Sequence, residues 1–297
     1  MTLVLPATTS ASRRSSSRWR FWRRLPIGIR LCLMVAALLV LTAALAPWVA
    51  PLDPDAQSLL SRLRPPAGFE RAKAGYLLGT DQLGRDVLSR CIHGLTVTLG
   101  MAALGTAISM TVGTGLGLLS GYLGGRVDDA IMTVVDIQIA VPFTLVALLV
   151  IAVAGTGIGV LILVLGIAYW EQYARIVRGQ VLALRGLPFV EAGRAIGMSD
   201  ARLLFRHILP NVASPIIVQA TLVISNLILL ESSLSFLGLG IQPPTASLGS
   251  MVGQGRDYMA SAPWIVAAPA LLIVAVALVV LLIGDWLRDA LDVRLAD

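Results

Sequence analysis

The apolar residues of this chain fall into six long runs that are separated by shorter, more polar segments. The runs lie near residues 31–50, 94–119, 130–153, 156–170, 212–238 and 264–285. A helix needs about 20 mostly apolar residues to cross a hydrocarbon core of about 30 Å. The pattern therefore predicts an all-α integral membrane protein with six transmembrane helices. The fourth run is the shortest and starts at a glycine-rich turn, so the third and fourth spans are expected to form a tight hairpin or to tilt strongly.

Positive charge gives the predicted spans an orientation. With a cytoplasmic N-terminus, 16 of the 23 Lys and Arg residues lie in the inside segments, which are 1–30, 120–129, 171–211 and 286–297. The remaining seven lie in the outside segments, which are 51–93 and 239–263. Because cytoplasmic loops are enriched in Lys and Arg, both termini are predicted to be cytoplasmic.

The same pattern divides the chain into five parts. They are a basic tail at 1–30, a first anchor helix at 31–50, an external segment at 51–93, a five-helix core at 94–285 that contains the inside segment 171–211, and a cytoplasmic tail at 286–297. The first tail is expected to be disordered and attracted to anionic membrane lipid. The N-terminus also has features of a secretory signal, with Ala44, Leu45 and Ala46 as a possible cleavage site. Since Pro47 follows directly and more spans come later, an uncleaved anchor is preferred.

Composition agrees with a membrane location and argues against other classes. The chain is 57% hydrophobic and only 13% charged, whereas soluble domains have about 25% charged residues. Its net charge of +6 is explained by the basic residues beside the first span, so no nucleic-acid partner is expected. A disulfide between Cys32 and Cys91 is not expected, because Cys32 lies inside the first apolar run.

Candidate catalytic chemistry is scarce. The two histidines, His93 and His207, fall on opposite sides of the predicted membrane, and no H-E-x-x-H motif is present. The only lysine, Lys73, follows an alanine, so there is no phosphate-binding loop of the G-K-[ST] type. The serines have no histidine on the same span that could activate them. We therefore expect no catalytic site, no metal and no cofactor in this chain.

The fifth span has two polar stripes at helical spacing. The first stripe lies within roughly 80° of one helix face and consists of Thr221, Ser225, Ser232 and Ser235. The second repeats every seven residues and consists of Gln219, Asn226 and Ser233. Such stripes either bond neighbouring helices or line a translocation pathway, and Glu231 on the same helix is open to both interpretations. With so little surface suited to lipid, this helix is expected to be central.

Two further features of the spans have alternative interpretations. Asp136 lies roughly two turns into the third span, where an ionised carboxylate is costly unless it is paired or near water. Either the helix enters the bilayer only after Asp136, or Asp136 is a partner or gate residue. Gly113 and Gly117 form a G-x-x-x-G pattern in the second span, for which close helix packing is the favoured interpretation.

The inside segment 171–211 is much longer than a simple connection between helices needs to be. Its apolar spacing predicts a first short helix that ends at Gly197, with Pro188 either kinking the helix or marking its start. Ser199 then caps a second helix that runs as far as Pro210. The segment is thus expected to be a helix-turn-helix at the membrane surface, suited to docking into a partner.

The sequence of this segment from Glu191 to Pro210, E-A-G-R-A-I-G-M-S-D-A-R-L-L-F-R-H-I-L-P, resembles the cytoplasmic coupling loop of ATP-binding cassette (ABC) importer permeases. The family pattern is E-A-A, three residues, G, and then I-x-L-P. Gly193 replaces the usual second alanine, and His207 stands where isoleucine is typical. Other stretches resemble the peptide branch of these permeases, among them L-G-T-D-Q-L-G-R-D-V-L-S-R at 78–90 and S-L-S-F-L-G-L-G-I-Q-P-P-T at 233–245.

This resemblance implies the fold of a type I ABC importer permease with six spans. It further implies a complex with a second homologous permease, cytoplasmic ATP-binding subunits that hydrolyse ATP, and an extracytoplasmic substrate-binding protein. The pathway would lie between the two permeases. The residues implied in the ATPase-coupling loop are Glu191, Ala192, Gly193, Arg194, Ala195, Gly197, Leu209 and Pro210. The implied substrate is a short peptide, with nickel or glutathione as alternatives. A self-sufficient secondary transporter would commonly show repeated halves, and none is evident.

Overall fold

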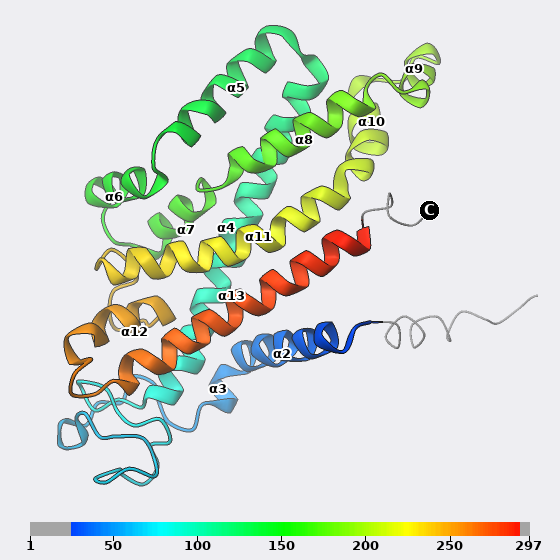
Figure 1. The fold of residues 1–297 in the computed structure, drawn as a ribbon. Coiled ribbons are helices and arrows are strands. Elements are labelled where there is room, and N and C mark those ends of the chain that lie inside the picture. Colours follow the sequence, from blue (N-terminus) through cyan, green and yellow to red (C-terminus); the bar gives the residue numbers. More distant parts are fainter. Residues whose placement is uncertain (1–24, 292–297) are drawn as a thin grey trace, which may run out of the picture.

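The computed structural model of the chain describes residues 25–291. Most of the predicted N-terminal tail and the last six residues of the predicted C-terminal tail lie outside these described residues. Within residues 25–291 the regular structure is helical, apart from one isolated bridge between Thr80 and Asp86. Figure 1 shows an elongated bundle in which α4 crosses the other long helices from end to end.

The helices follow one another with short connections, except in the external segment and between α11 and α12. They are α2 (Ile27–Ala44), α3 (Ala46–Val49), η1 (Leu59–Ser61), α4 (Val87–Leu123), α5 (Gly125–Ala140), α6 (Phe143–Ala154), α7 (Ile158–Gly166), α8 (Trp170–Leu184), α9 (Pro188–Ala195), α10 (Asp200–Leu203), η2 (Leu204–Ile208), α11 (Leu209–Phe236), α12 (Leu248–Gly255), η3 (Arg256–Tyr258) and α13 (Trp264–Leu291). In the part of the chain described, five helical stretches are long and apolar enough to cross a membrane, or six if the bent pair α5–α6 counts as one span. The predicted all-α membrane fold is confirmed.

The third predicted span, 130–153, is not one straight helix. It is divided between α5 and α6, which meet at an angle of 89°. Val141, before Pro142, has an extended backbone with φ −97° and ψ 127°. A residue before proline disfavours the helical conformation, and proline has no N–H to continue the helical hydrogen bonds. The bend therefore has a local cause that the apolar pattern does not reveal.

The fourth span is longer than the predicted apolar run 156–170. It combines α7 and α8 and extends from Ile158 to Leu184. The glycine-rich turn lies where it was expected, between α6 and α7, and Gly155 has a φ of +87° there. The apolar pattern ends early because α8 is amphipathic, with Arg and Gln residues among its apolar ones.

Close contact between α4 and α8 holds the centre of the bundle. A Cβ atom added at Gly113 would lie 2.2 Å from the Trp170 carbonyl oxygen, and one added at Gly117 would lie 2.6 Å from the Ala174 carbonyl oxygen. Gly121, one turn further, faces Val181 in the same way. These glycines recur every four residues, so one bare helix face admits the backbone of α8. The packing interpretation of the G-x-x-x-G pattern is confirmed.

This packing predicts that Gly117 and Gly115 of α4, two residues apart, differ sharply in how well they tolerate a larger side chain. Gly117→Val should destabilise the protein by about 1–3 kcal/mol, because the added methyl groups force α4 and α8 apart. The control is Gly115→Val, since no atom of the described part of the chain lies within 4 Å of a Cβ atom added at Gly115. Thermal unfolding in mild detergent measures the difference. Equal unfolding temperatures for the two variants would contradict the contact.

Candidate functional site

The segment predicted to couple the permease to a partner projects from one end of the bundle as α9 and α10 (Figure 1). Helix α9 starts at Pro188, which occupies a first-turn position that needs no N–H donor. Proline therefore marks the helix start and does not kink it. The helix ends at Ala195, and Gly197 takes the left-handed conformation with φ +77°.

The second helix of this segment departs from the prediction. It does not stop at Pro210: α10, the single π-helical turn η2 and α11 follow one another directly. Pro210 lies in the first turn of α11, so Leu209 and Pro210 form the base of the fifth span. The wider π turn precedes the position where proline cannot donate a helical hydrogen bond. Ser199 also makes no side-chain capping bond, although it does occupy the N-cap position.

Most of the predicted coupling residues lie on the surface. Glu191, Ala192, Arg194, Ala195 and Gly197 are exposed. Gly193 is buried, and a Cβ atom added there would lie 3.5 Å from Leu203 of α10, an ordinary contact distance. The site therefore has room for the alanine that the family pattern has at this position.

Sequence reasoning missed an apolar surface on the same segment. Ile196 is 79% exposed and Phe205 is 66% exposed, while Leu187 and Phe189 are each 41% exposed. We call these four residues the coupling patch. Several large apolar side chains exposed within one short segment are typical of a surface that another protein covers. The signal was hard to find in the sequence because apolar residues are so common in this chain.

A groove with a mostly apolar lining and a few amide side chains runs along α8, α11 and α13. It consists of adjoining cavities of about 720, 490 and 230 Å³, all lined in part by Gln219. Gln219 donates a 2.6 Å hydrogen bond to Gln172 of α8, which lines the two smaller cavities. Asn226 also lines the groove and is exposed, and Ser233 is exposed further along α11. Of the second polar stripe, Gln219 is buried and bonded, Ser233 donates to the Leu229 carbonyl of its own helix, and Asn226 faces the groove.

The first stripe is engaged in bonds within the chain. Thr221 and Ser232 donate to carbonyl groups of their own helix. Ser225, which also lines the groove, donates to the Ala277 carbonyl of α13 at 3.3 Å. Ser235 donates to the carboxylate of Glu231 at 2.7 Å. These contacts agree with the packing alternative, and a pathway role for this stripe stays a prediction.

Glu231 joins α11 to the short helix α12. It is 1% exposed, and its Oε1 atom accepts hydrogen bonds from Ser235 and Ser247, each at 2.7 Å. Ser247 is the N-cap of α12 and also accepts a bond from the backbone N–H of Ser250. The buried carboxylate therefore positions the start of α12.

A row of polar contacts attaches α5 to α8. Asp136 forms a 2.8 Å ion pair with Arg175, and both side chains are more than half exposed. Asp128 pairs with Arg178, whose Nη2 atom donates at 2.7 Å. The structure thus supplies the partner that Asp136 requires, while the predicted gate role remains a prediction.

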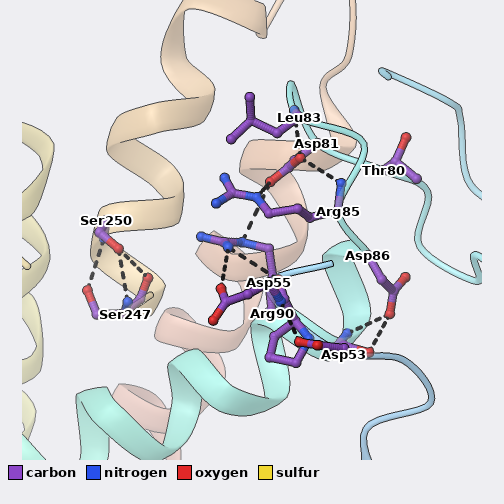
Figure 2. Close-up of polar contacts among 12 residues, drawn as sticks. Asp53, Asp55, Thr80, Asp81, Leu83, Arg85, Asp86, Arg90, Ser247 and Ser250 are labelled. Carbon is purple, nitrogen blue, oxygen red and sulfur yellow. Dashed lines mark hydrogen bonds and ion pairs between the residues drawn. The ribbon is translucent and has the colours of Figure 1, made fainter. Parts of the chain in front are cut away.

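The external segment is built around a buried ion-pair cluster, shown in Figure 2. Asp81 accepts bonds from the backbone N–H groups of Leu83 and Arg85 and from the Arg85 side chain at 2.6 Å. Arg90 lies 3.6 Å from the same carboxylate. Asp86 caps the start of α4 by accepting from the Ser89 N–H at 2.8 Å. The segment is therefore an ordered cap on the end of α4.

Comparison with known proteins identifies the family. A model described as "Binding-protein-dependent transport system inner membrane component" matches residues 113–297. The chain belongs to this family. The dipeptide transport system permease protein DppC of Haemophilus influenzae is 39% identical over 91% of this chain and 90% of its own length. The glutathione transport system permease protein GsiD of Pectobacterium atrosepticum is 38% identical over 99% of this chain and 97% of its own length.

The fold has a solved counterpart. A chain of the MetNI methionine ABC transporter, solved in inward-facing conformations, aligns with a TM-score of 0.56 and 19% identity, covering 69% of this chain and 95% of that chain. This likeness confirms the predicted type I ABC importer permease fold. The chain is accordingly a multi-pass inner-membrane permease subunit of an ABC transporter.

The geometry of α9 predicts that Gly193, which replaces the alanine of the family pattern, lowers the stability of the protein. Gly193→Ala should stabilise the protein by roughly 0.5–1 kcal/mol, because alanine is the better helix former and its methyl group meets Leu203 at an ordinary distance. Gly197→Ala is the contrasting variant and should destabilise, since φ is +77° there. Thermal unfolding of the purified permease gives the comparison. A loss of stability in Gly193→Ala would contradict the packing of α9 against α10.

Proposed function

We propose that this chain moves short peptides into the cell as one of two permease subunits in an ATP-driven complex. The observation that supports the coupling to ATP hydrolysis most directly is the coupling patch, which lies around α9 and in η2 of the projecting segment. The peptide assignment is supported by the relatives named as dipeptide and glutathione permeases, since glutathione is itself a tripeptide. Hydrolysis of ATP is assigned to partner subunits and not to this chain.

The proposed partners occupy the two ends of the bundle. Cytoplasmic ATP-binding subunits cover the coupling patch, with the exposed residues around Glu191 and Gly197 at the contact. A substrate-binding protein meets the external segment, and the cytoplasmic orientation of both termini that the charge pattern predicts is part of the same proposal. Desolvation of apolar anchors such as Ile196 would supply much of the binding free energy.

The groove is proposed as this chain's half of the translocation pathway. Exposed amide groups are costly against lipid, so a second permease that closes over the groove accounts for their placement. The amides of Gln172, Gln219 and Asn226 can both donate and accept, which matches the N–H and C=O groups of a peptide backbone. Asp136 and Arg175, at the edge of the smallest cavity, form a charge pair that can separate as the pathway opens.

Docking of the ATPase is tested by introducing a charge into the coupling patch. Ile196→Asp should greatly reduce recovery of the ATP-binding subunits with the permease in mild detergent, because a hot-spot loss of about 2 kcal/mol weakens binding roughly 30-fold. The matched control for ATPase recovery is Leu60→Asp, which changes an equally apolar side chain, 90% exposed, in the external segment at the other end of the bundle. Retention of the ATPase and of peptide uptake in Ile196→Asp would refute the proposed docking surface.

The pathway assignment is tested by cysteine labelling. In a variant whose two natural cysteines are replaced, Asn226→Cys should react with a water-soluble thiol reagent in the assembled complex, because it lines the groove. The control is Leu38→Cys on α2. The Leu38 side chain is 64% exposed, but α2 is an apolar candidate span whose surface is expected to face lipid, where a water-soluble reagent does not reach. Mass spectrometry gives the labelled fraction. Equal labelling at the two positions would contradict an aqueous groove. Protection of Asn226→Cys from labelling by a dipeptide, but not by a free amino acid, would support the assignment of peptides as the substrate.

A further inference from the structure

One side chain at the cytoplasmic end of α4 contacts both helices of the coupling segment. Tyr122 lies in the last turn of α4 and is 7% exposed. Its hydroxyl group donates a hydrogen bond to Oδ1 of Asp200, the first residue of α10. The guanidinium of Arg194, in the last turn of α9, lies 5.2 Å from the centre of its ring. The rigid ring thus bridges two helices that a left-handed glycine, Gly197, separates in the chain.

The two contacts have different physical origins and depend on different parts of tyrosine. The face of the ring attracts the Arg194 cation, which needs only an aromatic residue. The hydroxyl group donates to the charged Asp200 carboxylate, and hydrogen bonds to charged groups are among the stronger ones. A Tyr→Phe change therefore removes the hydrogen bond to Asp200 and keeps the aromatic ring beside Arg194.

The end of α4 that holds Tyr122 is itself firmly fixed. Arg185, just after α8, donates to the Gly121 carbonyl at 3.0 Å. Ser120 donates to Asp128 of α5, which in turn is paired with Arg178. Below this point α4 is packed against α8 along its glycine face. A displacement of Tyr122 would consequently displace a whole helix and not a frayed end.

We propose that Tyr122 is a positioning residue that transmits movement of the coupling segment to α4. When a partner moves α9, the Arg194–Tyr122–Asp200 contacts make α10 and the end of α4 move together with α9. Without them, α9 and α10 can turn about Gly197 while α4 stays in place. This inference rests on the proposed function, because it assumes that an ATPase docks on the coupling patch.

The test uses the complete complex in proteoliposomes and measures peptide transported per ATP hydrolysed. Tyr122→Phe should lower this ratio by about threefold or more while the ATP-binding subunits remain bound, since only a charge-assisted hydrogen bond is lost. Asp200→Ala should give a similar drop, and combining it with Tyr122→Phe should add little, as expected for two partners in one bond. Asp200→Asn keeps an acceptor oxygen and should restore most of the ratio.

The matched control is Tyr173→Phe, which removes a buried hydroxyl group that has no hydrogen-bond partner within residues 25–291 and should leave the ratio unchanged. A wild-type ratio in Tyr122→Phe, in an intact complex, would overturn the inference and leave the proposed function standing. Additive losses in the double variant would also overturn it. Failure of the proposed function itself looks different, because the unmodified chain would then purify without ATP-binding subunits or show no transport.

Discussion

The close approach of α4 and α8 is the contact on which the other features depend. In lipid, apolar surface gives helices little reason to associate, so contact depends on close packing and on hydrogen bonds between helices. The glycine face of α4 permits that packing, and Ser109 adds a 2.7 Å hydrogen bond to the Gly166 carbonyl at the break before α8. With α8 held there, its polar residues have fixed neighbours: Arg178 meets Asp128 of α5, and Gln172 meets Gln219 of α11. The groove and the start of the coupling segment follow from the same placement.

Polar groups in the bundle are costly unless they are paired, and their pairing explains much of the helix arrangement. Gln138 of α5 shows the principle, because its amide donates to the Ile167 carbonyl and its oxygen accepts from the Trp170 indole at 2.7 Å. The Ile167 carbonyl lies at the break between α7 and α8, where the helical ladder is interrupted. A side chain from α5 thus satisfies a backbone group exposed by that break. Where polar side chains lack such partners and face open space, as Asn226 does, a role beyond packing is the better explanation.

The sequence allowed the all-α membrane fold and the order of its apolar helices to be predicted, because hydropathy reports length and apolar content. It could not reveal the 89° bend at Pro142, since a bent and a straight apolar segment have the same composition. The spacing on the fifth span predicted both polar stripes but not which neighbour each one meets, which depends on how the helix is rotated in the bundle. Pro210 was interpreted as a helix end, although proline is equally compatible with a first turn. The coupling residues were identified through a resemblance, whereas the coupling patch required coordinates.

The contrast between α4 and its neighbours suggests how movement can be shared among the helices. Helix α4 has 37 residues and no break, so it is about 55 Å long, well beyond the thickness of the hydrocarbon core. At its external end the Ser89 hydroxyl accepts from the Leu52 N–H at 3.1 Å, which ties the external segment to the helix. The helix pairs α5–α6 and α7–α8 are each interrupted by a break. A pushed helix pair can bend at such a break, whereas a continuous helix moves as one rod and tilts. A displacement that enters α4 at its cytoplasmic end is therefore expected to reach the external segment.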